Sequence, residues 1–344
     1  MSVESTPAAA PSVDVDGGAY ARRLRNSLIG LVALIVVVGG LLLALPGLDV
    51  IERQLAHASL PWVFAAIGLE YLSCIGYVLT VMLAFPRGRL RPTARLGWAE
   101  LAANSVLPAG GLGGLGLGAW VLRRRGVPAA RIARRSTVVF VLTSAVNVAF
   151  LVIVGLALGL RLVAGPHDIL LTFGPAAVGL AAIVMTLGGA RAAGRFAASS
   201  RRERLAAALG SIARGVGDTV DELRHHDWRL IGPVAYFVFD VGALAASFAA
   251  TSHTPAIAAI VMAHLIGQLA GIIPIPGGVG AVDGGLVGAL ALYGVPFDAA
   301  AAAVLLYRAI SLTLPAVLGS IAFLLLRRHL DDPLVLRSEG TPAG

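Results

Sequence analysis

Charged residues are scarce in this chain of 344 residues, where Asp, Glu, Lys and Arg together make up 13%. Soluble globular proteins carry about 25%. Hydrophobic residues reach 57% and are gathered in long blocks, which is typical of a protein whose solvent is lipid. This composition excludes a soluble enzyme and a disordered protein for the bulk of the chain.

Lysine is absent, and cysteine occurs once. All 27 basic residues are arginine, and against 19 acidic residues they give a net charge of +8. Such an excess invites a nucleic-acid interpretation, but the arginines lie between apolar blocks, where membrane topology explains them better. We therefore expect no nucleic-acid partner. Cys74 lies inside an apolar run and, as the lone cysteine, forms no intrachain disulfide.

Six apolar segments are long enough to cross a bilayer, which requires about 20 residues: 27–46, 60–85, 136–160, 169–190, 230–250 and 299–326. Two further segments, 97–122 and 256–293, are each interrupted by a run rich in proline and glycine. Backbone broken at membrane depth is tolerated only where it is buried in protein or lines a cavity. We predict an all-α polytopic membrane protein with about six transmembrane helices and two opposed re-entrant helical hairpins.

The arginines test this topology because basic residues favour the cytoplasmic side. Twenty-four lie in the N-terminal flank, the loops 86–96, 123–135 and 191–229, and the C-terminal tail; the opposite loops hold only Arg53 and Arg161. Treating 97–122 as a hairpin places all five clusters on one side. We therefore expect a multi-pass protein of the cell (inner or plasma) membrane with both termini in the cytoplasm.

Three regions follow from this layout: a disordered cytoplasmic tail at 1–24, a transmembrane domain at 25–328, and a cytoplasmic tail at 329–344. The domain divides into half repeats at about 27–160 and 169–326, with a cytoplasmic linker at 191–229 that we expect to form one or two amphipathic helices.

The two halves carry matching motifs. At an offset of 168, Pro108 and Gly126-Val-Pro128 match Pro276 and Gly294-Val-Pro296. The hairpins enter from opposite faces, so the halves are predicted to be inverted, as in many transporters.

Ionisable side chains inside the apolar segments are candidates for function because each costs about 2.5–3.5 kcal/mol at the bilayer centre on insertion scales. Glu70 and Asp240 lie near the middle of the second and fifth spans. Arg308 follows Tyr307 in the last span, and Asp283 follows the second Gly-rich turn. These charges are expected to serve a substrate or protons; the alternative is that Arg308 pairs with Asp283 or Asp240 only to hold helices together.

The first arms of the hairpins also carry polar residues, namely Glu100 and Asn104 in the first and His264 and Gln268 in the second. For His264, a packing role is favoured over a ligand role. The run from Gly111 to Gly116 fits GxGxxG, but it lacks a preceding strand and a following acidic residue, and no GK[ST] occurs. We therefore expect no nucleotide or other cofactor. The run His225-His226-Asp227 has no further ligands at metal spacing, so we also expect no metal.

The runs NSVLPAGGLGGLGLGAWVLRRRGVP (104–128) and IPIPGGVGAVDGGLVGALALYGVPFDAAAAAVLLYRAISLTLP (273–315) resemble the flippase-like integral membrane family, the transmembrane region of lysylphosphatidylglycerol synthases. The resemblance covers roughly 25–328. Its motifs are a Pro-Gly-rich hairpin before Leu-Arg-Arg-Arg-Gly, then Pro-Gly-Gly-x-Gly, an acidic residue, Gly-Val-Pro and Leu-Tyr-Arg. The family-like positions are Asn104, Pro108, Gly110, Pro276, Gly277, Gly278, Gly280, Tyr307 and Arg308.

The resemblance implies movement of a lipid, such as aminoacylated phosphatidylglycerol or a lipid-linked sugar, between leaflets. Two departures limit it: Asp283 stands where relatives more often have Glu, and the soluble aminoacyl-transferase domain has no counterpart in this sequence. Lysyl-lipid synthesis is therefore not implied.

We expect a lipid flippase or transporter that moves an anionic or lipid-linked head group through a cavity between the two hairpins. The expected path comprises Arg308, Asp283, Glu70, Asp240, Asn104, Gln268 and Tyr307, and the turns comprise Pro108, Gly110, Gly111, Pro276, Gly277, Gly278 and Gly280. The alternatives are a membrane-embedded head-group transferase, for which His264, Asp283 and Glu100 are the available groups, and a scaffold subunit of a lipid-modifying complex. The expected partners are a phospholipid or lipid-linked sugar, and either a second copy of the chain or a lipid synthase.

Overall fold

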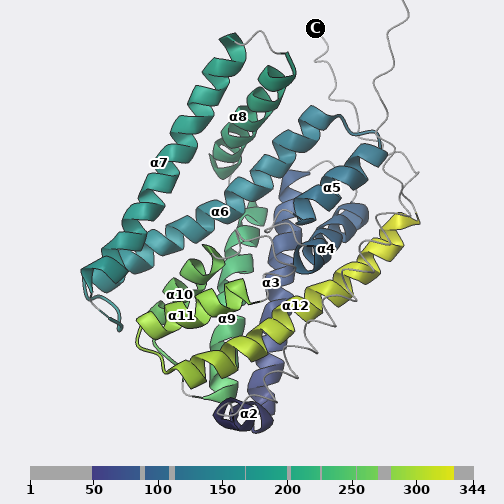
Figure 1. Cartoon of the computed structure of the whole chain (residues 1–344). Coiled ribbons are helices and arrows are strands. Elements are labelled where there is room, and N and C mark those ends of the chain that lie inside the picture. Colours follow the sequence, from purple (N-terminus) through teal and green to yellow (C-terminus); the bar gives the residue numbers. More distant parts are fainter. Residues whose placement is uncertain are drawn as a thin grey trace, which may run out of the picture.

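The computed structural model describes residues 49–85, 90–107, 113–166, 168–199, 203–224, 227–252, 254–269 and 280–328. Its helices are α2 (Asp49–Ala56), α3 (Leu60–Ala84), α4 (Leu90–Val106), α5 (Gly113–Arg124), α6 (Ala129–Gly159), α7 (Ile169–Ser199), α8 (Glu203–Arg224), the 3-10 turn η1 (Trp228–Leu230), α9 (Ile231–Thr251), α10 (Ile257–Leu269), α11 (Ala281–Leu292) and α12 (Phe297–Arg327) (Figure 1). Over these ranges there is no strand, which confirms the all-α class.

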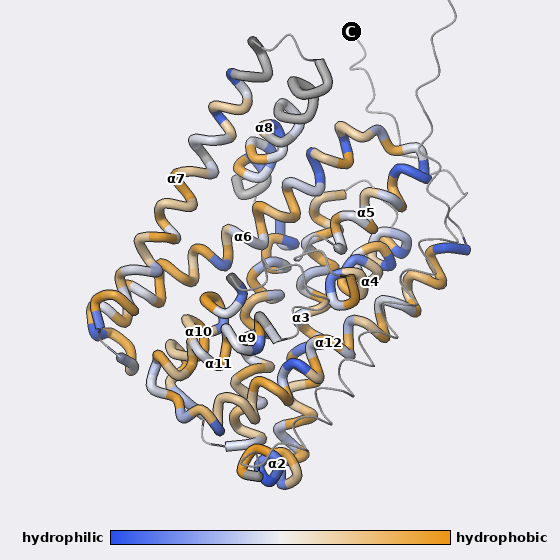
Figure 2. The backbone as a smooth tube through the Cα atoms, in the orientation of Figure 1, coloured by the Kyte–Doolittle hydropathy of each residue, from blue (hydrophilic) through white to orange (hydrophobic). Residues whose placement is uncertain are grey.

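Five helical segments are long and apolar enough to cross a membrane: Leu60–Ala84, Ala129–Gly159, Ile169–Arg195, Trp228–Thr251 and Phe297–Arg327. They match five of the six predicted spans; the other, 27–46, lies outside the described residues. Hydrophobic residues dominate along α6, α7 and α12, and hydrophilic ones gather where α6 begins and α12 ends (Figure 2). The chain is therefore a polytopic membrane protein.

Two parts of the chain repeat the same helix bounds at an offset of 168 residues. Helices α5 and α11 have 12 residues each, α6 and α12 have 31 each, and all four bounds keep that offset. The connecting turns are also alike: Gly126 and Gly294 have φ of +79° and +84°, a region that favours glycine. Pro128 and Pro296 then precede α6 and α12. The motif match seen in the sequence thus extends to the backbone.

Helices α3 and α9 pack tightly and run antiparallel. The Ser59 N–H donates to the Ala250 carbonyl at 2.9 Å at one end. Further along, Gly76 lies so close to α9 that a Cβ there would collide with the backbone N of Tyr236 and come within 2.8 Å of the Gly232 carbonyl oxygen. Small residues of this kind let helix backbones approach closely in membranes.

Each predicted hairpin appears as two short helices packed together. Gly113 faces the Ala103 carbonyl, and Gly118 faces the Glu100 side chain, so α5 runs back along α4. In the second pair, Gly267 of α10 packs on Leu286 of α11. These helices have 12 to 17 residues, or about 18–26 Å, which is short of the ~30 Å hydrocarbon core. The connecting turns at 108–112 and 270–279 lie outside the described residues, and re-entry stays a prediction.

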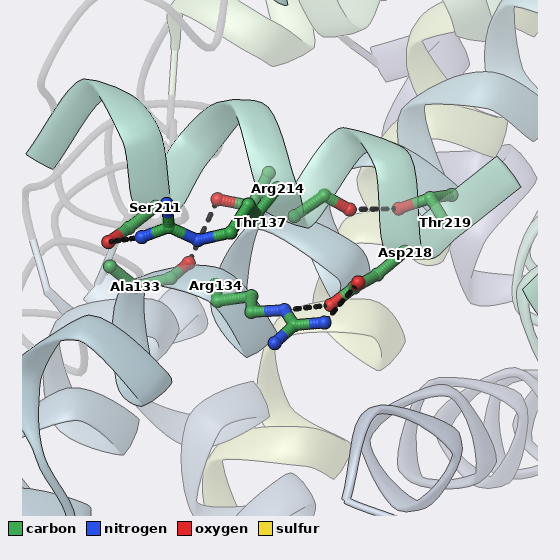
Figure 3. Close-up of polar contacts among 8 residues, drawn as sticks. Ala133, Arg134, Thr137, Ser211, Arg214, Asp218 and Thr219 are labelled. Atoms are coloured by element: carbon green, nitrogen blue, oxygen red, sulfur yellow. Dashed lines mark hydrogen bonds and ion pairs between the residues drawn. The ribbon is translucent and has the colours of Figure 1, made fainter. Parts of the chain in front are cut away.

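Helix α7 runs beyond its predicted span into the linker, and α8 lies within the linker, where one or two helices were expected. Helix α7 continues to Ser199, nine residues beyond the predicted end of the span, because residues 191–199 are rich in alanine and other helix formers. Helix α8 packs on α6 and α7. At its contact with α6, Arg134 forms an ion pair with Asp218 (Figure 3), and Gly215 brings the two helices together against Thr137.

Candidate functional site

Seven polar side chains meet where α3, α9, α10, α11 and α12 converge. We call them the polar cluster: Glu70, Asp240, His264, Gln268, Asp283, Tyr307 and Arg308. Around them lies the largest apolar core of the described residues, built mainly from α9 to α12. A connected group of polar residues inside an apolar core needs internal partners, because no water in the hydrocarbon can replace them.

Asp240 lies at the centre of the polar cluster. The Tyr307 hydroxyl donates to Asp240 Oδ1 at 2.6 Å, and His264 Nε2 lies 3.2 Å from Asp240 Oδ2. His264 Nε2 is also 2.6 Å from the Gln268 side-chain nitrogen, one helical turn further along α10. Both carboxylate oxygens of Asp240 therefore have partners, and these come from two other helices. The Asp240 side chain is 15% exposed and that of His264 only 3%.

Arg308 and Asp283 form an ion pair at the start of α11. Arg308 Nε donates to Asp283 Oδ1 at 2.6 Å, and both side chains are largely buried. Asp283 Oδ2 accepts the backbone N–H of Gly280 at 2.8 Å, so the same carboxylate closes the first turn of α11 and holds Arg308. Gly280 has φ of +88°, a conformation that explains glycine at this position.

Glu70 approaches Asp240 from the opposite helix. The two residues lie at the same level of the antiparallel helices, and their carboxyls are within electrostatic range of each other and of Arg308. Glu70 Oε1 accepts a weak hydrogen bond from the Cys74 thiol at 3.8 Å. Its other oxygen, Oε2, is buried and has no hydrogen-bond partner within the part of the chain that the structure describes.

A second polar contact lies in the first hairpin. The Tyr77 hydroxyl donates to Glu100 Oε2 at 3.0 Å, and the glutamate side chain lies over Gly118, where any Cβ would collide with it. Asn104 Oδ1 accepts the backbone N–H of Gly114 at 2.7 Å. Asn104 thus fastens the start of α5 to α4, and among the described residues it forms no hydrogen bond with the polar cluster.

The structure brings together six of the seven residues expected on the path, namely Glu70, Asp240, Gln268, Asp283, Tyr307 and Arg308, and leaves Asn104 apart. Of the predicted turn residues, Gly280 begins α11; Pro108, Gly110, Gly111, Pro276, Gly277 and Gly278 lie outside the described residues. His264, for which a packing role was favoured, is buried and contacts Asp240. The sequence could have indicated that His264 belongs to a polar site, because His264 and Gln268 are four residues apart and therefore lie on the same face of a helix.

This arrangement has two chemical capacities. The guanidinium of Arg308 beside the N-terminus of α11 suits an anion, because helix N-termini carry partial positive charge. The carboxyls, imidazole and phenol around Asp240 can exchange protons or bind hydroxyl groups. Over the described residues, no group of three or more His, Cys, Asp and Glu side chains is placed to hold a metal ion.

Comparisons with known proteins give the family. The family described as the lysylphosphatidylglycerol synthase TM region matches residues 28–319, a range that contains the whole polar cluster. A UPF0104 membrane protein of Methanocaldococcus jannaschii is 32% identical over 99 residues, which are 28% of this chain and 30% of that protein. The match thus spans less than a third of the relative's length. On the family match, together with the five apolar helices, the chain belongs to the family of the lysylphosphatidylglycerol synthase transmembrane region.

Proposed function

We propose that this protein is a lipid flippase or transporter, which moves an anionic or lipid-linked head group between the leaflets of a membrane. One observation carries the proposal: a connected set of charged and polar side chains lies in the apolar core of helices that have the length and composition of membrane spans. Such residues are costly in lipid and mark substrate or ion pathways.

Arg308 is the head-group ligand in this proposal. A phosphate would displace the Asp283 carboxylate from the guanidinium. Both groups are oxyanions, and arginine binds each of them through charge-assisted hydrogen bonds. The backbone N–H groups at the start of α11 lie beside it and add a partial positive charge. The Asp240 side, with His264 and Tyr307, would face the polar part of the head group.

An inverted repeat would provide the two alternating entrances. Support comes from the helix bounds that recur at 168 residues and from α3 and α9, which occupy equivalent places in the two halves and run antiparallel. Inverted halves with discontinuous helices near the midplane are typical of secondary transporters. In this proposal the turns at 107–111 and 276–280 enter from opposite faces and meet near the bilayer centre, and lipid passes between them.

Reconstitution tests the proposal directly. Purified protein in liposomes with fluorescently labelled phosphatidylglycerol should speed the transfer of label between leaflets. Arg308→Ala should abolish this transfer, and Arg308→Lys should impair it because lysine keeps the charge but loses the planar fork. Arg327→Ala, at the exposed end of the same helix, is the matched control and should transfer lipid like the wild type. Wild-type rates in Arg308→Ala would refute the head-group role.

A second candidate is a membrane-embedded head-group transferase. The contact between His264 and Asp240 favours it, since a carboxylate that orients an imidazole is a common general-base arrangement. The two functions differ in products: a transferase makes a new lipid species, whereas a flippase changes only the leaflet distribution. Mass spectrometry of the lipids recovered from the same liposomes separates them.

A further inference from the structure

Glu70 has no role in the head-group contact described above, although it is a buried ionisable residue beside Asp240. It is 5% exposed. Cys74 offers one weak donor to Oε1, and no donor of the described chain reaches Oε2. The described chain thus stabilises the charged form of Glu70 only weakly, so a further negative charge nearby favours binding of a proton, which makes the group neutral.

The charges around Glu70 also favour a bound proton, because acidic groups outnumber basic ones. The polar cluster has three carboxyls (Glu70, Asp240 and Asp283) but one guanidinium, that of Arg308. A protonated His264 would supply one more positive charge. An anionic head group that binds Arg308 would add a further negative charge to a region of low dielectric, where an uncompensated charge is strongly disfavoured.

We propose that Glu70 is a proton-binding group and that one proton enters the polar cluster with each anionic lipid head group that binds at Arg308. The proton forms an O–H bond at Oε2 of Glu70, which then donates to the Asp240 carboxylate. It leaves to solvent when the head group leaves, so that the charge of the polar cluster is the same with and without the anion. This inference rests on the proposed function and specifies its coupling ion.

The groups that face Glu70 are consistent with this assignment. They are Cys74 on α3 itself, Tyr236 and Asp240 on α9, and Tyr307 and Arg308 on α12, with His264 of α10 acting through Asp240. From α4, the nearest is Glu100, which Tyr77 already binds two turns along α3. Helix α6 has its charged residues, Arg131, Arg134 and Arg135, only in its first two turns, and Arg229 of η1 reaches the Met82 carbonyl. Arg308 is thus the one permanent cation that these elements place near Glu70.

A route for the proton exists through Asp240. Its Oδ1 accepts from Tyr307 and its Oδ2 faces His264, which in turn contacts Gln268 on the exposed side of α10. Asp240 Oδ2 and the Gln268 amide both contact His264 Nε2, so this nitrogen can take a proton from Asp240 and release it beside the exposed Gln268. A proton can therefore move between Glu70 and the surroundings without passing the Arg308–Asp283 pair.

The first experiment measures protons and binding, and needs no transport. Purified protein in detergent and weak buffer, with a pH indicator, is titrated with short-chain phosphatidylglycerol. Wild type should take up about one proton per bound lipid, by linkage between the two ligands. Glu70→Gln should bind the lipid with no uptake, while Glu70→Asp, which keeps a carboxyl, should retain it. Zwitterionic phosphatidylcholine should cause no uptake in any variant.

The matched control is Ser247→Ala. Ser247 is fully buried on α9, and its hydroxyl donates only to the Ala243 carbonyl of its own helix among the described residues. This variant should take up protons like the wild type. Infrared spectra add an independent readout: a carbonyl band of a protonated carboxylic acid should appear on lipid binding in wild type and be missing in Glu70→Gln.

The second experiment imposes a pH gradient on liposomes that contain labelled phosphatidylglycerol. Wild type should accumulate the label in the leaflet that faces the alkaline compartment, and Glu70→Gln should equilibrate it without bias. Wild-type transfer with neither bias nor proton uptake would overturn the coupling and leave the flippase function intact. Proton uptake on binding without any transfer would overturn the flippase function instead, and the absence of lipid binding would overturn both.

Discussion

The ion pair between Arg308 and Asp283 gives the sharpest test of whether these residues act on a substrate or only join helices. Both side chains are mostly removed from solvent, at 15% and 21% exposed. Removing one partner of a buried pair costs about 3–5 kcal/mol, because it leaves the other charge uncompensated. We expect Arg308→Ala to lower the free energy of unfolding by about 3 kcal/mol, at the lower end of this range, because the pair retains some exposure.

The two substitutions of Asp283 should differ from each other. Asp283→Asn keeps an oxygen that can accept the Gly280 N–H, whereas Asp283→Ala loses this hydrogen bond as well as the ion pair. Loss of a helix N-cap contact costs about 1 kcal/mol. Asp283→Ala should therefore be less stable than Asp283→Asn by about that amount.

The assay is a double-mutant cycle of Arg308→Ala and Asp283→Asn, followed by reversible unfolding in mixed micelles and by lipid transfer in liposomes. The double variant should recover about 1.5–3 kcal/mol relative to the sum of the single effects, since it leaves neither charge alone. Its lipid transfer should stay abolished, because the head-group ligand is missing. A coupling free energy below about 0.5 kcal/mol would show that the pair does not form, and restored transfer would show that Arg308 serves packing alone.

Three further predictions concern the architecture. Gly76→Val should lower the free energy of unfolding by about 1–3 kcal/mol in mixed micelles, because α3 and α9 must separate to admit the side chain; an unchanged value would contradict the close crossing. Cysteines introduced at the exposed Arg124 and Arg214 should both react with an impermeant maleimide only from the cytoplasm, and the native cysteine is buried; labelling of Arg124→Cys from outside would make 97–122 a full span. Asp218→Asn should cost only about 0.2–1 kcal/mol, because its partner Arg134 is 43% exposed; a loss above about 2 kcal/mol in the same unfolding assay would show that this contact holds α8 in place.

Sequence patterns predicted the helices well and their contacts less well. The predicted span 60–85 differs by one residue from α3, and 299–326 differs by three residues in total from α12. The length of an apolar run is dictated by the bilayer, so composition alone defines it. The end of α7 was missed because an alanine-rich segment can continue a helix beyond the membrane: Arg191 and Arg195 mark the end of the apolar run, but they do not end the helix.

The partners within the polar cluster depend on how each helix is rotated about its axis. Glu70 and Asp240 were expected near the middle of the second and fifth spans, and the level that they share follows from the antiparallel packing of α3 and α9. The contact of His264 with Asp240, and that of Tyr77 with Glu100, join residues 24 and 23 positions apart on different helices. No periodicity within one helix specifies such a contact, because the glycine contacts between helices set the rotation. The partner of Asn104 could not be predicted for the same reason: its side-chain oxygen accepts the Gly114 N–H within its own pair of helices.

The crossing of α3 and α9 at Gly76 has a mechanical consequence for the two carboxyls. Gly76 is six residues from Glu70, or about 9 Å along the helix. A rotation of ~10° of one helix against the other, with the glycine contact as the fulcrum, therefore displaces Glu70 from Asp240 by about 1.6 Å. In the proposed coupling, an increase of that size would break the hydrogen bond that a protonated Glu70 donates to Asp240. Within that proposal, a small rocking of α3 against α9 at the Gly76 contact would be enough to make or break the proton exchange between Glu70 and Asp240.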